Sequence, residues 1–377
     1  MNNQDFNREI LPLKINSFQR LTVCKNCFQP LKEELEEFLD ETPYLNTKDF
    51  LTSVLFRLEL KANNAVEGIT DDIRIIEQVI ENAQSITDVN RRNQIKNLYN
   101  GYRYILRENQ INKTNLKHLY SLLSKDILEP SDKIRMGEYY REAPVYILRG
   151  GRLDDSYDMG IDEKEIEEHM NMYFEYVNSN DNCHTATDHY IKSQIMHYYF
   201  VFVHPYFDIN GRTSRTVAMW YLLNNQSYPY IIFNRAISLD SKYDKMIQAV
   251  KELGNINRFI NYMLLNVKKE LEKECIMKNI SESTIGLTAL DFQTLEYLLS
   301  MNGNITVLDF CSIYDRFNDK QKVKDIFETM LDPLIQKGIL TVDRETNKEM
   351  FSNQPNLFLK LNKTMLDNPD KIKRLVI

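Results

Sequence analysis

The stretch of sequence that decides the fold is HPYFDINGRTSR, which runs from His204 to Arg215. A helix is expected to precede it and to end near Val203, because Pro205 cannot continue a helix. A short polar loop follows, and a second helix is expected to begin near Gly211 with Asn210 as its N-cap. The segment therefore predicts a helix–loop–helix unit with polar side chains gathered at the start of the second helix.

The start of the second helix is expected to bind an anion, because free backbone N–H groups and the helix dipole both favour negative charge there. Arg212 and Arg215 are three residues apart and so share one helix face. Arginine can hold phosphate oxygens with two parallel hydrogen bonds. Asp208 offers a carboxylate of the kind that holds Mg²⁺ together with substrate phosphates. His204 can act as a general base near neutral pH. These residue types within twelve positions predict a phosphate-transfer site.

The segment resembles the signature of the Fic family, His-Pro-Phe-x-Asp/Glu-Gly-Asn-Gly-Arg-x-x-Arg, and departs from it at two positions. Tyr206 replaces the usual Phe, a conservative change because this aromatic ring packs under the loop. Ile209 replaces the usual Gly or Ala and so affects the shape of the phosphate-binding nest. The resemblance implies Mg²⁺-dependent transfer of AMP from ATP to a Ser, Thr or Tyr hydroxyl of a target protein, the reaction called AMPylation.

The same resemblance implies a role for each matching residue. His204 would deprotonate the target hydroxyl, and Asp208 would hold Mg²⁺ bridging the α- and β-phosphates. The backbone amides after Asn210, beginning at Gly211, would stabilise charge on the phosphates together with Arg212. Arg215 would bind the γ-phosphate. The chemistry is then mainly positioning and charge stabilisation.

A second motif, NNAVEG, begins at Asn63 and resembles the inhibitory motif of the family, Ser/Thr-x-x-x-Glu-Gly/Asn. The helix that contains it should end at Gly68, a suitable residue for the position after a helix. In the family this glutamate pairs with the second arginine of the signature, here Arg215, and occupies the place of the γ-phosphate. We therefore expect Glu67 to inhibit the reaction from an N-terminal inhibitory helix. Asn63 stands where Ser or Thr is usual and can still hydrogen-bond.

A third segment, GEYYREAPVYI at residues 137–147, resembles the β-hairpin flap that lies over the active site in this family. Val145–Leu148 is β-prone, and the pair Gly150-Gly151 suits a tight hairpin turn. The exposed edge of such a hairpin can pair with an extended segment of the target by strand addition. Two supporting residues are expected nearby: His197 as a buried residue of the helix before the loop, and Tyr243 in the base pocket by a looser resemblance.

The composition predicts a mainly α protein. Only 11 glycines and 10 prolines occur in 377 residues, too few for a β-sandwich or barrel of this size. Together with the resemblance, this gives a Fic-type helical bundle with a small β-hairpin flap. Apolar residues recur at helical spacing in the segments 47–66, 73–83, 91–108, 116–128, 163–177, 188–203, 212–224, 242–253 and 258–273.

We expect three parts along the chain: an N-terminal segment 1–46, a Fic domain 47–277 that includes the inhibitory helix, and a winged-helix-like domain 285–377. The polar run 278–284 is the expected linker. The last part is expected to contain three helices followed by two strands, the order of a winged-helix domain; these elements are 290–299, 307–314, 322–336, 338–342 and 357–361.

The charge of the chain argues against nucleic acid and anionic membranes as partners, and its cysteines argue against a disulfide framework and a zinc site. The net charge is −7, which gives no general attraction to nucleic acid or to anionic membranes. From Ser281 onward there are 12 basic and 14 acidic residues, a net of −2. Nucleic-acid binding by this part is therefore not expected, and we favour a protein-docking or architectural role. Five scattered cysteines, with a single Cys24-x-x-Cys27 pair, indicate neither a disulfide framework nor a zinc site.

The sequence also has no signal peptide and no apolar run near the ~20 residues that span a bilayer, so a cytoplasmic location is expected. A homodimer is compatible with the sequence. Two other functions stay open. The same site can remove AMP from modified proteins, with Glu67 positioning water. Alternatively, the chain is a winged-helix DNA-binding regulator in which the Fic-like part senses a nucleotide.

Overall fold

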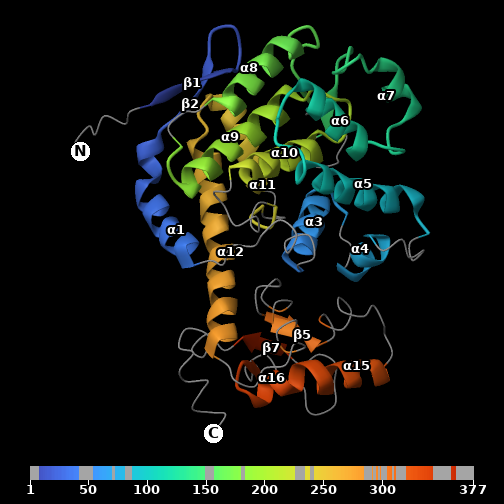
Figure 1. Cartoon of the computed structure of the whole chain (residues 1–377), viewed down its shortest axis with the longest axis vertical. Coiled ribbons are helices and arrows are strands. Elements are labelled where there is room, and N and C mark those ends of the chain that lie inside the picture. The colour runs from blue at the N-terminus through green and yellow to red at the C-terminus, as the bar shows by residue number, and fades with distance from the viewer. Residues whose placement is uncertain are drawn as a thin grey trace. The chain divides into compact units, whose positions relative to one another are not determined.

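A computed structural model gives the fold of the chain (Figure 1). It divides into two compact units, Met1–Glu270 and Leu271–Ile377. The described residues are 8–41, 54–69, 73–80, 87–148, 157–179, 183–225, 234–237, 242–283, 291, 294–295, 298, 304–307, 310, 320–342 and 358–361.

The first unit is built around two helices that follow each other in the sequence, α9 (Ala186–Val203) and α10 (Asn210–Asn224), and that pack against each other. Nearly every residue of both helices is buried, including many polar ones. A helix that is buried on all sides shows no apolar stripe, because every face meets protein. The loop 204–209 that joins this central pair is anchored by the buried residues Pro205, Tyr206 and Ile209, while Asp208 is exposed.

The other helices of the first unit surround this pair, and α3, α5 and α6 each contact α10 (Figure 1). Capping explains where several begin: Asp88 and Asn112 cap α5 and α6 with side-chain bonds to Arg91 and Asn115, and Thr185 forms a capping box with Asp188 at α9. The surrounding helices are α3 (Val54–Val66), α4 (Ile73–Ile80), α5 (Val89–Ile105), α6 (Lys113–Leu123), α7 (Pro130–Arg135), α8 (Ile166–Asn178), α11 (Lys242–Leu253) and α12 (Asn257–Ser283).

The predicted β-hairpin is confirmed. Strands β3 (Tyr146–Leu148) and β4 (Tyr157–Met159) pair antiparallel, with Tyr146 opposite Met159. The connection that contains Gly150 and Gly151 lies outside the described residues, so the tight turn expected there stays a prediction. The mainly helical fold predicted from the scarcity of glycine and proline is also confirmed.

The N-terminal segment has a structure that the sequence analysis did not predict. Strands β1 (Glu9–Lys14) and β2 (Arg20–Val23) form an antiparallel hairpin, followed by the short 3-10 helix η1 (Lys25–Phe28) and helix α1 (Gln29–Glu41). Leu11 and Leu13 of β1 point inward, which fits the two-residue alternation of a strand with one buried face. The segment therefore belongs to the first compact unit.

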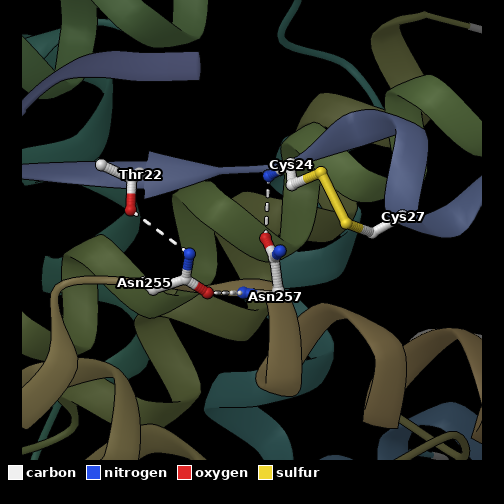
Figure 2. The surroundings of a disulfide bond; sticks show 5 residues. All are labelled: Thr22, Cys24, Cys27, Asn255 and Asn257. Carbon is white, nitrogen blue, oxygen red and sulfur yellow. Dashed lines mark hydrogen bonds between the residues drawn. A yellow bond between two sulfur atoms is a disulfide. The ribbon is translucent and has the colours of Figure 1, made fainter. Parts of the chain in front are cut away.

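A disulfide between Cys24 and Cys27 follows this hairpin (Figure 2). The sequence analysis assigned this pair no role, so the bond is a finding of the structure. The backbone N–H of Cys24 donates to Oδ1 of Asn257 at 2.9 Å. The Asn255 side chain donates to Oγ1 of Thr22 and accepts from the backbone N–H of Asn257. These bonds tie the hairpin to the start of α12.

The second unit contains a three-stranded antiparallel sheet in the order β5-β7-β6. Two of its strands were predicted, β6 (Leu340–Val342) and β7 (Phe358–Leu361), whereas β5 (Asn304–Thr306) was not. The predicted helix 322–336 is present as α15 (Lys320–Ile326), the π-helical turn η2 (Phe327–Leu331) and α16 (Asp332–Gln336). The predicted helices 290–299 and 307–314 lie mostly outside the described residues, and the winged-helix assignment stays a prediction.

Helix α12 is longer than the sequence predicted. It continues to Ser283 and so includes nearly all of the polar run 278–284, in which we expected the linker. The helix lacks a glycine or proline in this run, so nothing local stops it. The boundary between the two compact units falls inside α12, after Glu270. In the part of the chain that the structure describes, no helix is both long and apolar enough to cross a bilayer.

Candidate functional site

The site lies where the C-terminal end of α9 meets the N-terminal end of α10. His204 follows α9 in the left-handed conformation, with φ 52° and ψ 60°. This turns the chain sharply at the residue before Pro205, which cannot continue a helix. The Nδ1 atom of the His204 ring lies 3.3 Å from the carbonyl oxygen of Val201. This contact anchors one ring nitrogen and leaves Nε2 at the far side of the ring.

Asn210 shapes the loop in a way that the sequence analysis did not predict. It is the first residue of α10 and not its N-cap, which is Ile209. The Asn210 side chain accepts from the backbone N–H of Tyr206 at 3.0 Å and donates to the carbonyl oxygen of the same residue at 2.8 Å. The side-chain amide thus satisfies both the N–H and the C=O of Tyr206, as the backbone of a paired strand residue would, and holds the loop closed. The predicted N-cap role of Asn210 is wrong, because its side chain serves the loop instead of the helix.

Ile209 occupies the left-handed conformation, with φ 66°, and is almost fully buried. This conformation is unusual for a β-branched residue. It explains structurally why a small residue is usual at this place in the resembling signature. The side chain of the preceding residue, Asp208, accepts from the backbone N–H of Ile209 at 2.6 Å and so supports this turn.

Tyr206 packs beneath the loop as expected. Its ring is fully buried and stacks on Tyr120 of α6, with centroids 3.6 Å apart and the rings 10° from parallel. The hydroxyl has no hydrogen-bond partner among the described residues. The ring therefore carries the contact, and a phenylalanine would serve equally well.

The Glu67 carboxylate and the Arg215 guanidinium form an ion pair beside the start of α10, as the inhibitory motif predicts. Nη2 of Arg215 donates to Oε1 of Glu67 at 2.6 Å. Arg215 is 1% exposed, and Glu67 is 34% exposed. A Cβ atom added to Gly211 would come within 2.3 Å of the same Glu67 oxygen. The carboxylate thus lies directly against the first turn of α10, where backbone N–H groups and the helix dipole favour an anion.

The charges around Glu67 favour its ionised form. Burial acts to raise the pKa of Glu67, but the guanidiniums of Arg215 and Arg212 outweigh it, and the pKa lies below its ordinary value. His204 lies near enough to act in the same direction. Burial lowers the pKa of Arg212, and Glu67 and Asp208 oppose this. The predicted residues therefore share one electrostatic site, and the residue directly after α3, Glu67, contributes its carboxylate to it.

Arg212 is 6% exposed, and its Nη1 donates to Oε1 of Gln94 on α5 at 3.0 Å. Its Nε has no hydrogen-bond partner among the described residues. A buried guanidinium N–H without a partner is costly, and a bound phosphate oxygen would satisfy it. The sequence analysis did not predict the contribution of Gln94.

Asn63 strengthens the hold of α3 on Arg215. Its Oδ1 accepts from Nε of Arg215 at 2.8 Å, and its backbone oxygen accepts from Nη2 at 3.1 Å. The substitution of Asn for the usual Ser or Thr thus retains a hydrogen bond to this arginine. The Asn63 side chain also reaches the hydroxyl of Tyr102 at 3.4 Å.

A buried polar network extends from Asn63 and Tyr102. No local pattern in the sequence predicts it. The Tyr102 hydroxyl accepts from the Asn234 side chain at 2.8 Å, and the Asn234 backbone N–H donates to Glu59 at 2.7 Å. Glu59 is fully buried, with the Arg235 guanidinium 3.6 Å away. Glu59 and Asn63 are four residues apart, so they share one face of α3, and Glu67 directly follows the last residue of that helix, Val66. Helix α3 is therefore held to the rest of the first unit by polar contacts along one face.

Arg141 connects the base of the flap to the loop, and the sequence analysis quoted it without assigning it a role. It is 1% exposed. Its side chain donates to the carbonyl oxygens of His204 at 2.8 Å, Ala143 at 2.9 Å and Ile161 at 2.5 Å. Its backbone N–H donates to the oxygen of Pro205 at 2.9 Å. One buried side chain thus fixes the flap against the residue that the signature identifies as the base.

Comparison with known proteins agrees with this geometry. The Fic/DOC family model matches residues 110–222, which include the flap and the signature but not Glu67. The protein adenylyltransferase Fic of Aedes aegypti is 27% identical over 203 residues, a match that covers 52% of this chain and 37% of that protein. The chain thus matches little more than a third of that relative's length.

Two solved structures share the fold. A Fic family protein from Desulfovibrio desulfuricans G20 superposes with a TM-score of 0.53 at 16% identity, covering 94% of this chain and 98% of that one. Fic-1 from C. elegans gives a TM-score of 0.52 at 16% identity, covering 69% and 74% of the two chains. The signature and the hairpin both lie inside the segment 110–222 that matches the Fic/DOC family model, so this segment is a Fic/DOC domain.

Proposed function

We propose that this protein transfers AMP from ATP to a hydroxyl side chain of a target protein, and that Glu67 restrains the reaction. The observation that carries the proposal is the Glu67 carboxylate bound to Arg215 against Gly211. A carboxylate at this place has the charge and the hydrogen-bonding geometry of a phosphate oxygen. The printed name of the Aedes aegypti relative, protein adenylyltransferase, supports nucleotide transfer in general.

In this proposal the residues of the loop divide the chemistry between them. The hydroxyl of the target loses its proton to His204 and its oxygen attacks the α-phosphorus, while pyrophosphate leaves. The first N–H groups of α10, including that of Gly211, stabilise the charge that develops on the phosphates. Arg212 and Arg215 bind the outer phosphates. Asn210 holds the loop in the shape that presents these donors.

Asp208 would hold Mg²⁺, which would neutralise phosphate charge during transfer. Its carboxylate is exposed beside the start of α10, and the described residues contain no cluster of three or more metal-ligating side chains. This fits an ion held by one carboxylate, substrate phosphates and water, as is usual for Mg²⁺.

The test is label transfer from α-labelled ATP in cell extract by four proteins: the parent, Glu67→Gly, Glu67→Gly with His204→Ala, and Glu252→Gly. Glu252 is an exposed carboxylate near the end of α11 and serves as the matched control. We expect Glu67→Gly to increase transfer at least tenfold, because it frees Arg215, and the added His204→Ala to abolish it. Glu252→Gly should behave as the parent.

Removal of AMP from a modified protein is the alternative that the same experiment distinguishes. If Glu67 positions water for hydrolysis, Glu67→Gly loses release of AMP from a pre-labelled protein and gains no transfer. Equal labelling by the proteins with and without His204 would refute the mechanism proposed here.

A further inference from the structure

Glu59 of α3 is a carboxylate that lies entirely inside the first unit, and the proposed reaction does not use it. None of its surface is exposed. Arg235 supplies an opposite charge, with Nε 3.6 Å from Oε1 of Glu59. A carboxylate that has lost its hydration is stable in the interior only when it is paired and hydrogen-bonded. The docked position of α3 therefore depends on the groups that meet Glu59.

Arg235 belongs to a short turn, residues 234–237, that lies against α3. The backbone N–H of Ile237 donates to the carbonyl oxygen of Asn234 at 3.0 Å, and both residues are buried. The backbone N–H of Asn234 donates to Oε2 of Glu59 at 2.7 Å. The turn is thus fixed by its own burial and presents the Arg235 side chain to the carboxylate.

A second carboxylate, that of Glu270 on α12, also lies beside Arg235. Its Oε2 atom is 3.9 Å from Nε of the arginine. The Arg235 side chain is 10% exposed and that of Glu270 is 14% exposed, so salt and water screen these charges little. Two carboxylates from different helices thus hold one guanidinium, and Arg235 joins α3 to α12.

A movement of α3 at Glu59 would also move the inhibitory carboxylate. Glu59 and Asn63 share one face of the helix, and Glu67 directly follows its last residue. Asn63 accepts from Arg215 at 2.8 Å, and Glu67 accepts from it at 2.6 Å. Because a helix moves as a rigid element, the fit of Glu59 in the interior and the fit of Glu67 at the site depend on each other.

We propose that Arg235 is a positioning residue for autoinhibition: its guanidinium compensates the buried charge of Glu59 and so keeps α3 docked, with Glu67 against Arg215. The inference rests on the proposed function, in which Glu67 restrains transfer. Without the guanidinium, the ionised Glu59 is stabilised by moving toward water, and α3 withdraws with it. Removing one partner of a buried ion pair is costly for this reason, whereas removing both charges together is not.

The test measures label transfer from α-labelled ATP at pH 8 by the parent, by Arg235→Met, and by Arg235→Met with Glu59→Gln. At this pH Glu59 is ionised, because burial raises its pKa only to about 7 against the opposing charge of Arg235. Methionine keeps an unbranched side chain without the charge or the donors. We expect Arg235→Met to raise transfer about three- to tenfold, because the uncompensated charge disfavours the docked helix. The added Glu59→Gln should return transfer to that of the parent, because no buried charge remains at this position.

Two comparisons separate this role from a general loss of stability. In Glu67→Gly protein, Arg235→Met should give no further increase, because both changes remove the same restraint. Lys268→Met is the matched control, since Lys268 of α12 pairs with Glu34 of α1. It removes an ion pair of α12 that does not involve α3, and its transfer should equal that of the parent.

Hydrogen exchange of the backbone amides of α3, followed by mass spectrometry, is a readout that does not depend on catalysis. Arg235→Met should speed exchange in α3 at least threefold and leave exchange in α9 unchanged, because only α3 withdraws. Lys268→Met should change neither. If Glu67→Gly transfers no more than the parent, the proposed function fails, and the exchange of α3 still tests the role of Arg235.

The inference is overturned if Arg235→Met transfers no more than the parent while Glu67→Gly transfers more. It is also overturned if exchange in α3 does not increase, if Arg235→Met raises transfer equally in Glu67→Gly protein, or if the added Glu59→Gln does not restore the restraint. Should Arg235→Met fail to fold, the double variant decides. It must fold and transfer as the parent does, and an unfolded or unrestrained double variant refutes the role of Arg235.

Discussion

Glu67 and Arg215 lie 148 residues apart in the sequence, yet Nη2 of the arginine donates to the glutamate carboxylate at 2.6 Å. The contact closes one side of the anion-binding start of α10. It is made by a carboxylate that is one-third exposed and an arginine that is almost fully buried. The exposed partner is therefore the one that can leave, and the buried arginine left without its partner favours the binding of another anion in its place.

The first prediction concerns Gly211. A Cβ at this position would lie 2.3 Å from Oε1 of Glu67 and 3.1 Å from Nη1 of Arg215, so it would fill the place where the carboxylate now lies. If the carboxylate stands where a phosphate oxygen binds, Gly211→Ala should weaken ATP binding at least tenfold even in Glu67→Gly protein. Calorimetry with ATP and with adenosine is the measurement. Adenosine binding should hardly change, and an equal loss for both ligands would contradict the assignment of the phosphate site.

The second prediction concerns Arg141, whose side chain donates to three backbone oxygens of the flap base and of His204. Lysine keeps the charge but cannot spread its donors across three carbonyl groups as a guanidinium does. In Glu67→Gly protein, Arg141→Lys should lower transfer at least tenfold and cost about 1–3 kcal/mol of the free energy of unfolding. Arg258→Lys is the control, since Arg258 is an exposed arginine near the start of α12. Full activity of Arg141→Lys would show that the flap base does not depend on this residue.

The third prediction concerns pH. Burial raises the pKa of Glu59 to about 7, although Arg235 and the Asn234 hydrogen bonds act against it. Because the folded pKa exceeds the unfolded value, the folded protein retains a proton that the unfolded chain releases. The free energy of unfolding contributed by Glu59 is therefore greatest at low pH and is lost as the pH rises from 4.5 to about 7.

Glu59→Gln removes this titration. Relative to the parent, its free energy of unfolding should improve by about 2–3 kcal/mol between pH 5 and pH 8, as measured by denaturant unfolding at both values. The difference between the two pH values is the test, because any loss of packing or of hydrogen bonds caused by the substitution shifts both values by a similar amount. The same pH dependence in the variant as in the parent would show that Glu59 is not the titrating group.

Local chemistry allowed the centre of the fold to be predicted from sequence. Pro205 marks the end of α9, and the scarcity of glycine and proline marks the helical class. The pairing of Glu67 with Arg215 was expected from the resemblance of two motifs to those of the Fic family, and the structure contains this contact. The prediction that Asn210 is the N-cap of α10 was wrong for a physical reason. Its side chain can cap a helix or close a loop, and only the tertiary structure decides between these hydrogen bonds.

Other features depend on contacts between distant segments, which no periodicity encodes. The chain from Asn63 through Tyr102 and Asn234 to Glu59 joins three separate parts of the sequence. The first strand of the N-terminal hairpin could have been predicted from the sequence, because Leu11 and Leu13 alternate with other residues as buried strand residues do. It was missed because the apolar pattern is short and a proline lies between the two leucines.

The last prediction concerns Ile209, where two energies oppose each other. The left-handed backbone, with φ 66°, costs a β-branched residue about 1–2 kcal/mol. The side chain is 3% exposed, and truncation of a buried isoleucine to alanine costs about 2–5 kcal/mol. Burial is the larger energy, so both Ile209→Ala and Ile209→Gly should be less stable than the parent. Alanine keeps most of the backbone strain whereas glycine releases it, so the glycine variant should be the more stable of the two by about 1 kcal/mol.

Ile195, buried inside α9, provides the comparison: there glycine should be less stable than alanine by about 1 kcal/mol, because glycine disfavours a helix interior. Denaturant unfolding of the four variants decides the matter, since the order of alanine and glycine must reverse between the two positions if Ile209 is held in a strained conformation by the packing around the loop.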